Sequence, residues 1–211
     1  MKNIYKILIL ASYTSLFAQS PIINIAETRD VYNIEGAYYK DVDSVLNDFE
    51  GTWVMTTNNN DGTTSYLKIR LRKVALQYNA FRKSYSDELV GVYQYIDHGV
   101  EKVNTLSHFN DAILPWKFDI HGNNILFFNS KPDCPDCSLT EKRVSLSYYE
   151  EDRNYIGSSM LLRRMVSTSG QPMIKLRVMQ YNNILVIDGE PPHQFSNMIV
   201  PFGVYDLIKE P

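Results

Sequence analysis

The sequence predicts an all-β fold: a single antiparallel up-and-down barrel, or strongly rolled sheet, of about eight or nine strands with one short N-terminal helix. Apolar and polar residues alternate in several segments, such as residues 66–72, 143–148 and 174–178. Short polar turns separate such segments. A meander of many short strands must hide its two edges, and closure into a barrel removes them. The length of 211 residues fits one domain with a substantial core.

The first residues have the layout of a secretory signal peptide. Lys2 and Lys6 precede an apolar stretch, and Ala18 is a small residue suited to the position before a cleavage site. A membrane anchor is the alternative, but the unbroken apolar stretch is far short of the roughly 20 residues that a spanning helix needs. We therefore expect cleavage after Ala18, with residues 1–18 removed, and export to the periplasm or the medium.

The mature chain begins with an expected extended lead-in, residues 19–40, lying on the surface of a single domain formed by residues 41–211. The spacing predicts a short helix over residues 41–50, with Asp41 as its N-cap and Gly51 at its end. Four apolar residues fall on one face of this helix at positions i, i+3, i+4 and i+7: Val42, Val45, Leu46 and Phe49.

The strands after Gly51 are joined by polar turns. Turns are predicted at residues 58–62, 98–99, 121–124 and 167–171. The strands predicted beside the last three turns are residues 92–97 and 100–104, 116–120 and 125–129, and 160–166 and 173–180. A final strand is predicted at residues 202–208. In residues 66–72 three cations alternate with apolar residues, and we interpret them as the solvated face of a strand rather than a binding stripe.

A Gly-Thr-Trp sequence opens the first strand of the predicted meander. Only one register places the indole of Trp53 inside the barrel, where its N–H needs a buried acceptor. Gly51 and Trp53, after a short helix, resemble the pattern of the lipocalins. That resemblance implies that Trp53 closes one end of the barrel and that an Arg from a late strand packs over it. The candidates are Arg163, Arg164 and Arg177.

A resemblance to a second family extends over nearly the whole chain. The stretches "GAYYKD", "FEGTW", "GVYQYIDHGVEKVNTL", "KPDCPDCSLTEKR" and "SSMLLRRM" look like a family of small exported bacterial proteins known only as a domain of unknown function. The resemblance implies a signal peptide and a β-rich domain. It implies no activity.

The two cysteines, Cys134 and Cys137, lie in a loop between predicted strands. A redox pair needs its first Cys at the N-terminus of a helix in a βαβ unit, and a zinc site needs further ligands at suitable spacing. In an oxidising compartment two such close cysteines most simply form a local disulfide. We therefore predict a structural disulfide, with a reduced or variable pair and a redox or metal site as alternatives.

Signatures of catalysis are missing from the sequence. No Gly-x-Ser-x-Gly occurs. The acidic run at residues 150–152 is interpreted as a solvated turn, and the four His are scattered. The net charge of −3 gives no electrostatic footprint for nucleic acid. We expect no enzyme activity, no cofactor, no metal and no membrane span in the mature protein.

Two functions remain as hypotheses. The first is non-enzymatic binding of a small apolar or aromatic ligand at the barrel mouth, with Trp53, Tyr93 and Tyr95 as the candidate binding residues. Tyr93 and Tyr95 share one strand face, and aromatic side chains suit both packing and ligand pockets. The alternative is a cell-envelope module that binds another protein through its surface and has no ligand cavity. An open pocket beside Trp53 would favour the first hypothesis.

Overall fold

The computed structural model describes residues 21–27, 34–182, 184 and 193–211. The predicted signal peptide, residues 1–18, lies outside the described residues. Within them, no helix has both the length and the apolar character needed to cross a membrane.

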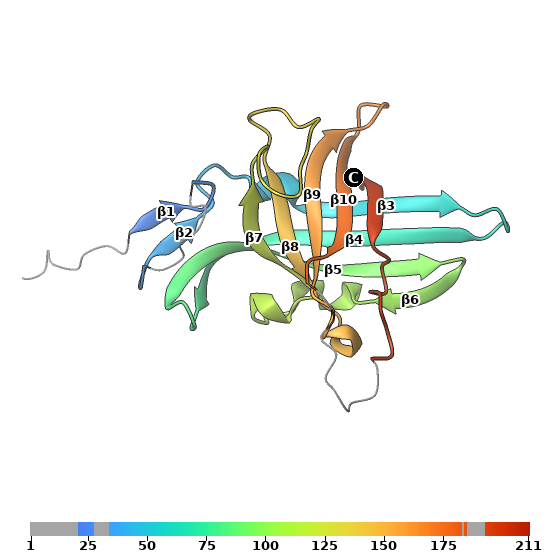
Figure 1. Ribbon diagram of the computed structural model, residues 1–211, viewed down its shortest axis with the longest axis horizontal. Helices are drawn as coiled ribbons and strands as arrows, with labels where there is room; N and C mark the ends of the chain where they lie inside the picture. Colours follow the sequence, from blue (N-terminus) through green and yellow to red (C-terminus); the bar gives the residue numbers. More distant parts are fainter. Residues whose placement is uncertain (1–20, 28–33, 183, 185–192) are drawn as a thin grey trace, which may run out of the picture.

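Eight strands form a closed antiparallel barrel, as predicted (Figure 1). They are β3 (Gly51–Asn58), β4 (Thr64–Asn79), β5 (Ser84–Asp97), β7 (Ile120–Leu126), β8 (Arg143–Tyr148), β9 (Ser158–Val166), β10 (Pro172–Gln180) and β11 (Gly203–Lys209). Each of these strands pairs with the next one in this order, and β11 returns to β3. The barrel is therefore an up-and-down meander.

The strands of the barrel form one continuous sheet that bends into two halves, called here the N-terminal and C-terminal sheets, and the strands of one half run across the direction of the other (Figure 1). The N-terminal sheet contains β3, β4 and β5, and the C-terminal sheet contains β7 to β11. Two short seams join the sheets. At one seam Ile208 and Lys209 of β11 pair with Val54 and Trp53 of β3. At the other seam β5 and β7 share three residue pairs, beginning with Leu89 and Gly122.

The barrel interior is filled by side chains from both sheets. Burial alternates along β4, where Leu67, Ile69 and Leu71 are buried and the residues between them are partly exposed, as the period of two predicts. The other inward-facing residues are large and apolar, and they pack as one cluster: Trp53, Tyr93, Leu146, Met160, Leu162, Ile174, Leu176 and Leu207. This cluster is the core of the protein.

The predicted lead-in contributes two short strands beside the barrel. β1 (Ile22–Asn24) pairs in parallel with β2 (Tyr38–Lys40), and β2 pairs in parallel with the first residues of β5. Tyr39 of β2 is fully buried. The lead-in therefore extends the N-terminal sheet beyond the barrel.

The predicted helix over residues 41–50 is wrong. Only the 3₁₀ turn η2 (Leu46–Phe49) forms, and Ser44 has a φ of 57°, outside the helical range. Val42, predicted on the buried face, is 54% exposed, whereas the other three apolar residues of that face are buried. A left-handed residue after the first turn prevents an α-helix from propagating.

The predicted N-cap, Asp41, is not the cap residue of this turn, which is Val45, but its carboxylate binds the start of the turn. Its buried carboxylate accepts hydrogen bonds from the backbone N–H groups of Val45 (2.8 Å) and Leu46 (2.9 Å). The same carboxylate pairs with Lys73 Nζ of β4 at 2.9 Å, and Lys73 also lies 3.7 Å from the carboxylate of Asp87 on β5. The side chain therefore ties the turn to the N-terminal sheet.

The turn predicted at residues 121–124 is also wrong, because these residues lie inside β7. The pairing of β7 with β8 shifts between His121 and Asn124, which marks a β-bulge. Of the two strands predicted at residues 116–120 and 125–129, only Ile120, Ile125 and Leu126 lie in β7, and Trp116 lies in the 3₁₀ turn η4 (Pro115–Lys117). A Gly-Asn-Asn run suits a bulge as well as a turn, so the sequence pattern is ambiguous here.

β5 is covered on its outer face as well. The two-residue turn at His98 and Gly99, both with positive φ, leads into β6 (Val100–Asn104), as predicted. The chain then forms η3 (Leu106–Asn110) and η4 on the outside of the barrel. Together these segments bury a small second cluster around Val90, Val92 and Phe118.

Candidate functional site

Trp53 closes one end of the barrel. It is fully buried, and its Nε1 donates a hydrogen bond to the backbone oxygen of Phe49 at 2.8 Å. Gly51 precedes it with a φ of 124°, a conformation that favours glycine. The guanidinium carbon of Arg164 lies 5.0 Å from the ring centroid, and Lys209 Nζ lies 5.2 Å from it on β11. Trp53 is therefore a packing anchor, and Arg164 is the arginine that covers it.

A buried hydrogen-bond network lies near the other end, around the carboxylate of Glu150. This carboxylate accepts hydrogen bonds from the hydroxyl groups of Tyr148 and Tyr93, the latter at 3.0 Å. Arg153 Nη1 pairs with it at 3.0 Å, and the backbone N–H of Ile199 donates to it at 2.9 Å. The network joins β5, β8 and the segment that precedes β11.

Glu150 is only 6% exposed, which corrects the interpretation of residues 150–152 as a solvated turn. Glu151 and Asp152 are exposed as expected, but Glu150 is not. Tyr148 and Glu150 are two residues apart, so an extended chain directs both side chains to the barrel side. The spacing of Tyr148 and Glu150 could have predicted the burial of Glu150. The two exposed carboxylates that follow it suggested a solvated acidic run instead.

The two tyrosines of the network donate from their neutral form. Burial raises the pKa of Tyr93 and of Tyr148, and the nearby negative charge of Glu150 raises both further. The rings meet edge to face, with their centroids 5.4 Å apart. Near neutral pH both phenols of the network are therefore uncharged.

A closing segment, residues 193–201, covers this end of the barrel. Met198 and Val200 are buried in the core. The hydroxyl of Tyr155 donates to the backbone oxygen of Phe195 at 3.1 Å and accepts from its N–H at 3.0 Å. The closing segment therefore packs into the core at this end of the barrel.

The mouth cleft lies beside the closing segment and has a volume of about 680 Å³. Its lining includes Tyr93 and the side chains of Trp116 and Tyr149, which are 47% and 44% exposed. The remaining lining is mostly polar: Val103, Thr105, His108, Lys117, Asp119, Glu150, Glu151, Asp152, Arg153 and Ile199. The cleft thus combines aromatic surfaces with hydrogen-bonding groups.

Asp119 is the half-buried carboxylate of the mouth cleft. Burial raises its pKa, and the charge of Glu150 raises it further, while the hydrogen bond from Thr105 and the proximity of His108 act in the opposite direction. A carboxyl group in such surroundings gains from a hydrogen-bond donor that reaches it from a bound molecule.

A second cleft, of about 560 Å³, adjoins the first one and is lined by Tyr95. Both clefts are lined by Asp152, Arg153 and Ile199. Of the predicted binding residues, Tyr93 and Tyr95 therefore lie at adjoining clefts. Trp53 lies at the opposite end and lines none of the five clefts described for residues 21–27, 34–182, 184 and 193–211.

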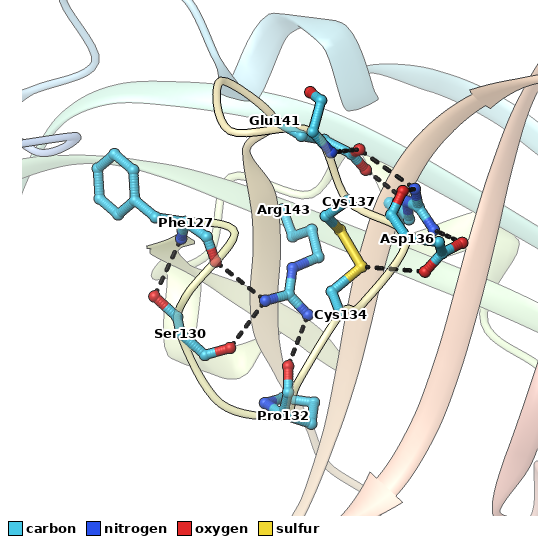
Figure 2. Close-up of a disulfide and its surroundings, with 10 residues drawn as sticks. Phe127, Ser130, Pro132, Cys134, Asp136, Cys137, Glu141 and Arg143 are labelled. Atoms are coloured by element: carbon cyan, nitrogen blue, oxygen red, sulfur yellow. Dashed lines mark hydrogen bonds and ion pairs between the residues drawn. A yellow bond between two sulfur atoms is a disulfide. The ribbon is translucent and has the colours of Figure 1, made fainter.

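The predicted disulfide between Cys134 and Cys137 is confirmed (Figure 2). It lies in the disulfide loop, residues 127–142, which joins β7 to β8 over the outer face of the C-terminal sheet. The guanidinium of Arg143, at the start of β8, stabilises this loop by donating hydrogen bonds to three backbone oxygens, those of Phe127, Ser130 and Pro132, at 2.8–3.0 Å. Among the described residues no group of three or more His, Cys, Asp or Glu side chains is arranged to hold a metal ion.

Comparison with known proteins finds no match among curated proteins or solved structures. One family model, described as a family of unknown function, DUF6705, matches residues 1–210. The resemblance inferred from the five sequence stretches is thereby confirmed as membership of a family of unknown function. The chain belongs to the family of unknown function DUF6705.

Proposed function

We propose that the protein is an exported, non-enzymatic binding protein that takes a small molecule with an aromatic or apolar ring in the mouth cleft. The observation that carries the proposal is the pair of half-exposed rings, Trp116 and Tyr149, beside a half-buried carboxylate in a cleft of about 680 Å³. Ligand sites combine apolar and aromatic walls with a few placed polar groups, and their volumes lie between about 300 and 1,000 Å³.

The mouth cleft is a better ligand site than the barrel interior. Side chains fill the interior from Trp53 at one end to the closing segment at the other. A ligand inside the barrel would have to displace packed residues such as Met198 and Val200. The likeness to the lipocalin pattern rests on Gly51, Trp53 and the covering Arg164, and we restrict it to that packing arrangement.

Asp119 would select ligands that carry an N–H or O–H donor. It is the half-buried acceptor of the cleft, and the buried carboxylate of Glu150 already accepts four donors. The same engagement argues against Glu150 as a general base, because proton transfer would require it to release those donors. A site that binds a ligand without catalysing a reaction is consistent with both the half-buried acceptor Asp119 and the fully engaged carboxylate of Glu150.

The protection of Trp116 from acrylamide quenching tests this proposal. In a Trp53→Phe variant Trp116 is the only tryptophan, since the chain has two. We expect benzyl alcohol, a neutral aromatic probe with one O–H donor, to protect Trp116 saturably. In the matched Trp116→Phe variant the remaining Trp53 is fully buried and should respond to neither quencher nor probe.

Replacing Asp119 should weaken this protection. We expect Asp119→Ala to reduce the apparent affinity for benzyl alcohol at least fivefold. Asp206→Ala, on an exposed position of β11, serves as the matched control and should leave the affinity unchanged. If benzyl alcohol and related aromatic alcohols give no saturable protection of Trp116, the ligand-binding proposal fails.

A second function, a surface module that binds another envelope protein, is favoured by one observation. The far end of the β4–β5 hairpin exposes Leu76 and Tyr78, and Phe81 at its tip is 97% exposed. A photo-crosslinking residue in place of Phe81 should give one defined adduct in producing cells, while the same residue in place of exposed Lys131 gives none. Equal labelling at the two positions would argue against the module.

A further inference from the structure

We propose that the pocket beneath the disulfide loop is a binding site for a small organic carboxylate. The pocket has a volume of about 180 Å³ and lies between the loop and the outer face of β8 to β11. It is remote in sequence from the mouth cleft and shares no lining residue with it. Figure 2 shows four of its lining residues, Pro132, Cys134, Asp136 and Arg143.

The floor of the pocket carries an unusual row of positive charge. Arg143 of β8 pairs in register with Arg163 of β9, and Arg163 pairs with Lys175 of β10. Like charges directly opposite each other on neighbouring strands destabilise a sheet. Arg177, two residues after Lys175, lies on the same face of β10 and also lines the pocket.

The loop compensates for only part of this charge. Arg163 pairs with Asp136 at 2.7 Å and, more closely, with Glu141. The guanidinium of Arg143 donates to backbone oxygens, which neutralise no charge. Four cations and two carboxylates, those of Asp133 and Asp136, line the pocket, so its lining has a net charge of +2 in a chain whose net charge is −3.

Lys175 and Arg177 supply the unused positive charge. Neither side chain makes a hydrogen bond or an ion pair with any of the residues that the structure describes. Asp206 lies opposite Lys175 in the pairing of β10 with β11, but it does not line the pocket. An anion in the pocket would therefore meet two cations whose hydrogen-bonding capacity is free.

The remaining walls of the pocket are apolar. Leu161 of β9, Val204 of β11 and Pro132 of the loop line it, together with Cys134 of the disulfide. A bare inorganic anion gains nothing from such walls, whereas a carboxylate with a short hydrocarbon group can bury that group against them. The volume of about 180 Å³ lies below the range of about 300–1,000 Å³ that is typical of sites for drug-sized ligands, which suits a molecule of only a few carbon atoms.

The proposal is tested by following the amide resonances of the protein in its oxidised form during titration with butyrate, acetate and inorganic phosphate. Butyrate should produce saturable shifts around the disulfide loop and along β9 and β10. It should bind more tightly than acetate, because its hydrocarbon chain contacts the apolar walls. Added salt should weaken the binding, since both cations are close to solvent.

Variants of Lys175 and Arg177 distinguish butyrate binding in this pocket from non-specific association of butyrate with the protein surface. Lys175→Met and Arg177→Met should each weaken butyrate binding at least fivefold, and the double variant at least tenfold. Neither side chain makes a hydrogen bond or an ion pair with the described residues, so both variants should keep the native fold in the absence of ligand. Lys102→Met, on an exposed position of β6, is the matched control and should bind butyrate like the unmodified protein.

Three results would overturn the proposal. The first is the absence of saturable shifts with butyrate. The second is tighter binding of phosphate than of butyrate, which would make the site one for inorganic anions. The third is unchanged butyrate affinity in the folded Arg177→Met variant. None of these results bears on the mouth cleft, which involves different residues.

Discussion

Replacing Glu150 should destabilise the protein more than replacing any exposed carboxylate. In Glu150→Ala the hydroxyl groups of Tyr93 and Tyr148, the guanidinium of Arg153 and the N–H of Ile199 all lose their shared acceptor. Removing one partner of a buried ion pair costs about 3–5 kcal/mol, because the other partner stays buried without compensation. We therefore expect Glu150→Ala to lower the free energy of unfolding by about 3–5 kcal/mol.

Glu150→Gln keeps the shape of the side chain and one oxygen acceptor but removes the charge. Hydrogen bonds to a charged group contribute about 1.5–3 kcal/mol each, against about 1 kcal/mol for neutral ones. The expected loss is therefore smaller, about 2–3 kcal/mol. Glu151→Gln, at the exposed neighbouring position, is the control and should change the stability by less than about 0.5 kcal/mol.

Urea unfolding followed by tryptophan fluorescence measures these differences, with the slope of the transition checked for constancy. Native-state hydrogen exchange adds a local reading, because the N–H of Ile199 should exchange faster in both Glu150 variants. If Glu150→Gln and Glu151→Gln unfold at the same urea concentration, the network contributes no net stability and the reasoning from its contacts is refuted.

Four further predictions address other parts of the molecule. Trp53→Ala should lower the free energy of unfolding by roughly 3–5 kcal/mol, the usual cost of truncating a core aromatic; a red-shifted, freely quenched tryptophan emission from this position would contradict its burial. Replacing Cys134 and Cys137 together with Ser should cost only about 1–3 kcal/mol, because the closed loop is short; two free thiols by alkylation of the oxidised protein would contradict the disulfide. Burial, together with the hydrogen bond to a neighbouring carboxylate, raises the pKa of Tyr38 from 10.0 to about 12. Its contribution to stability is thus complete below about pH 10 and is lost as the pH rises through about 12, so the fall in melting temperature over this range should be smaller in Tyr38→Phe. Mass spectrometry of the exported protein should find Gln19 at the N-terminus, and an intact Met1 on the mature species would contradict export by signal-peptide cleavage.

The parts of the fold with a strict pattern could be predicted from the sequence. The alternation in residues 66–72, 143–148 and 174–178 identified β4, β8 and β10, because each has one face in the core and one face outside. The burial of Trp53 followed from Gly51, since the register after that glycine leaves only one inward position. The antiparallel connectivity followed from the short turns.

The errors arose where a side chain overrides the local pattern. Residues 41–50 have helical spacing, but Ser44 takes a positive φ and Asp41 binds a lysine of β4, a long-range partner that spacing alone does not reveal. The bulge at residues 121–124 reads as a turn because both favour Gly and Asn. Glu150 appeared solvated because two of its four partners, Tyr93 and Ile199, are about 50 residues away in the chain.

The mouth cleft was predicted only in part. Tyr93 and Tyr95 were identified from their shared strand face, but Trp116, Asp119 and Tyr149 were not, because the cleft assembles η4, β5 and the residues after β8. No local motif marks such an assembly. The pocket beneath the disulfide loop was missed for a similar reason, since its cations lie on three different strands.

The two short seams of the barrel have a mechanical consequence. A barrel whose strands all pair along their full length resists changes of its cross-section, since any widening breaks many hydrogen bonds together. Here the two sheets meet through two residue pairs at the β3–β11 seam and three at the β5–β7 seam. Separation at either seam would break fewer residue pairs than separation of neighbouring strands within one of the two sheets, such as β9 and β10 or β3 and β4. Ile208 and Leu89, one at each seam, are the positions whose amide exchange would report such a separation.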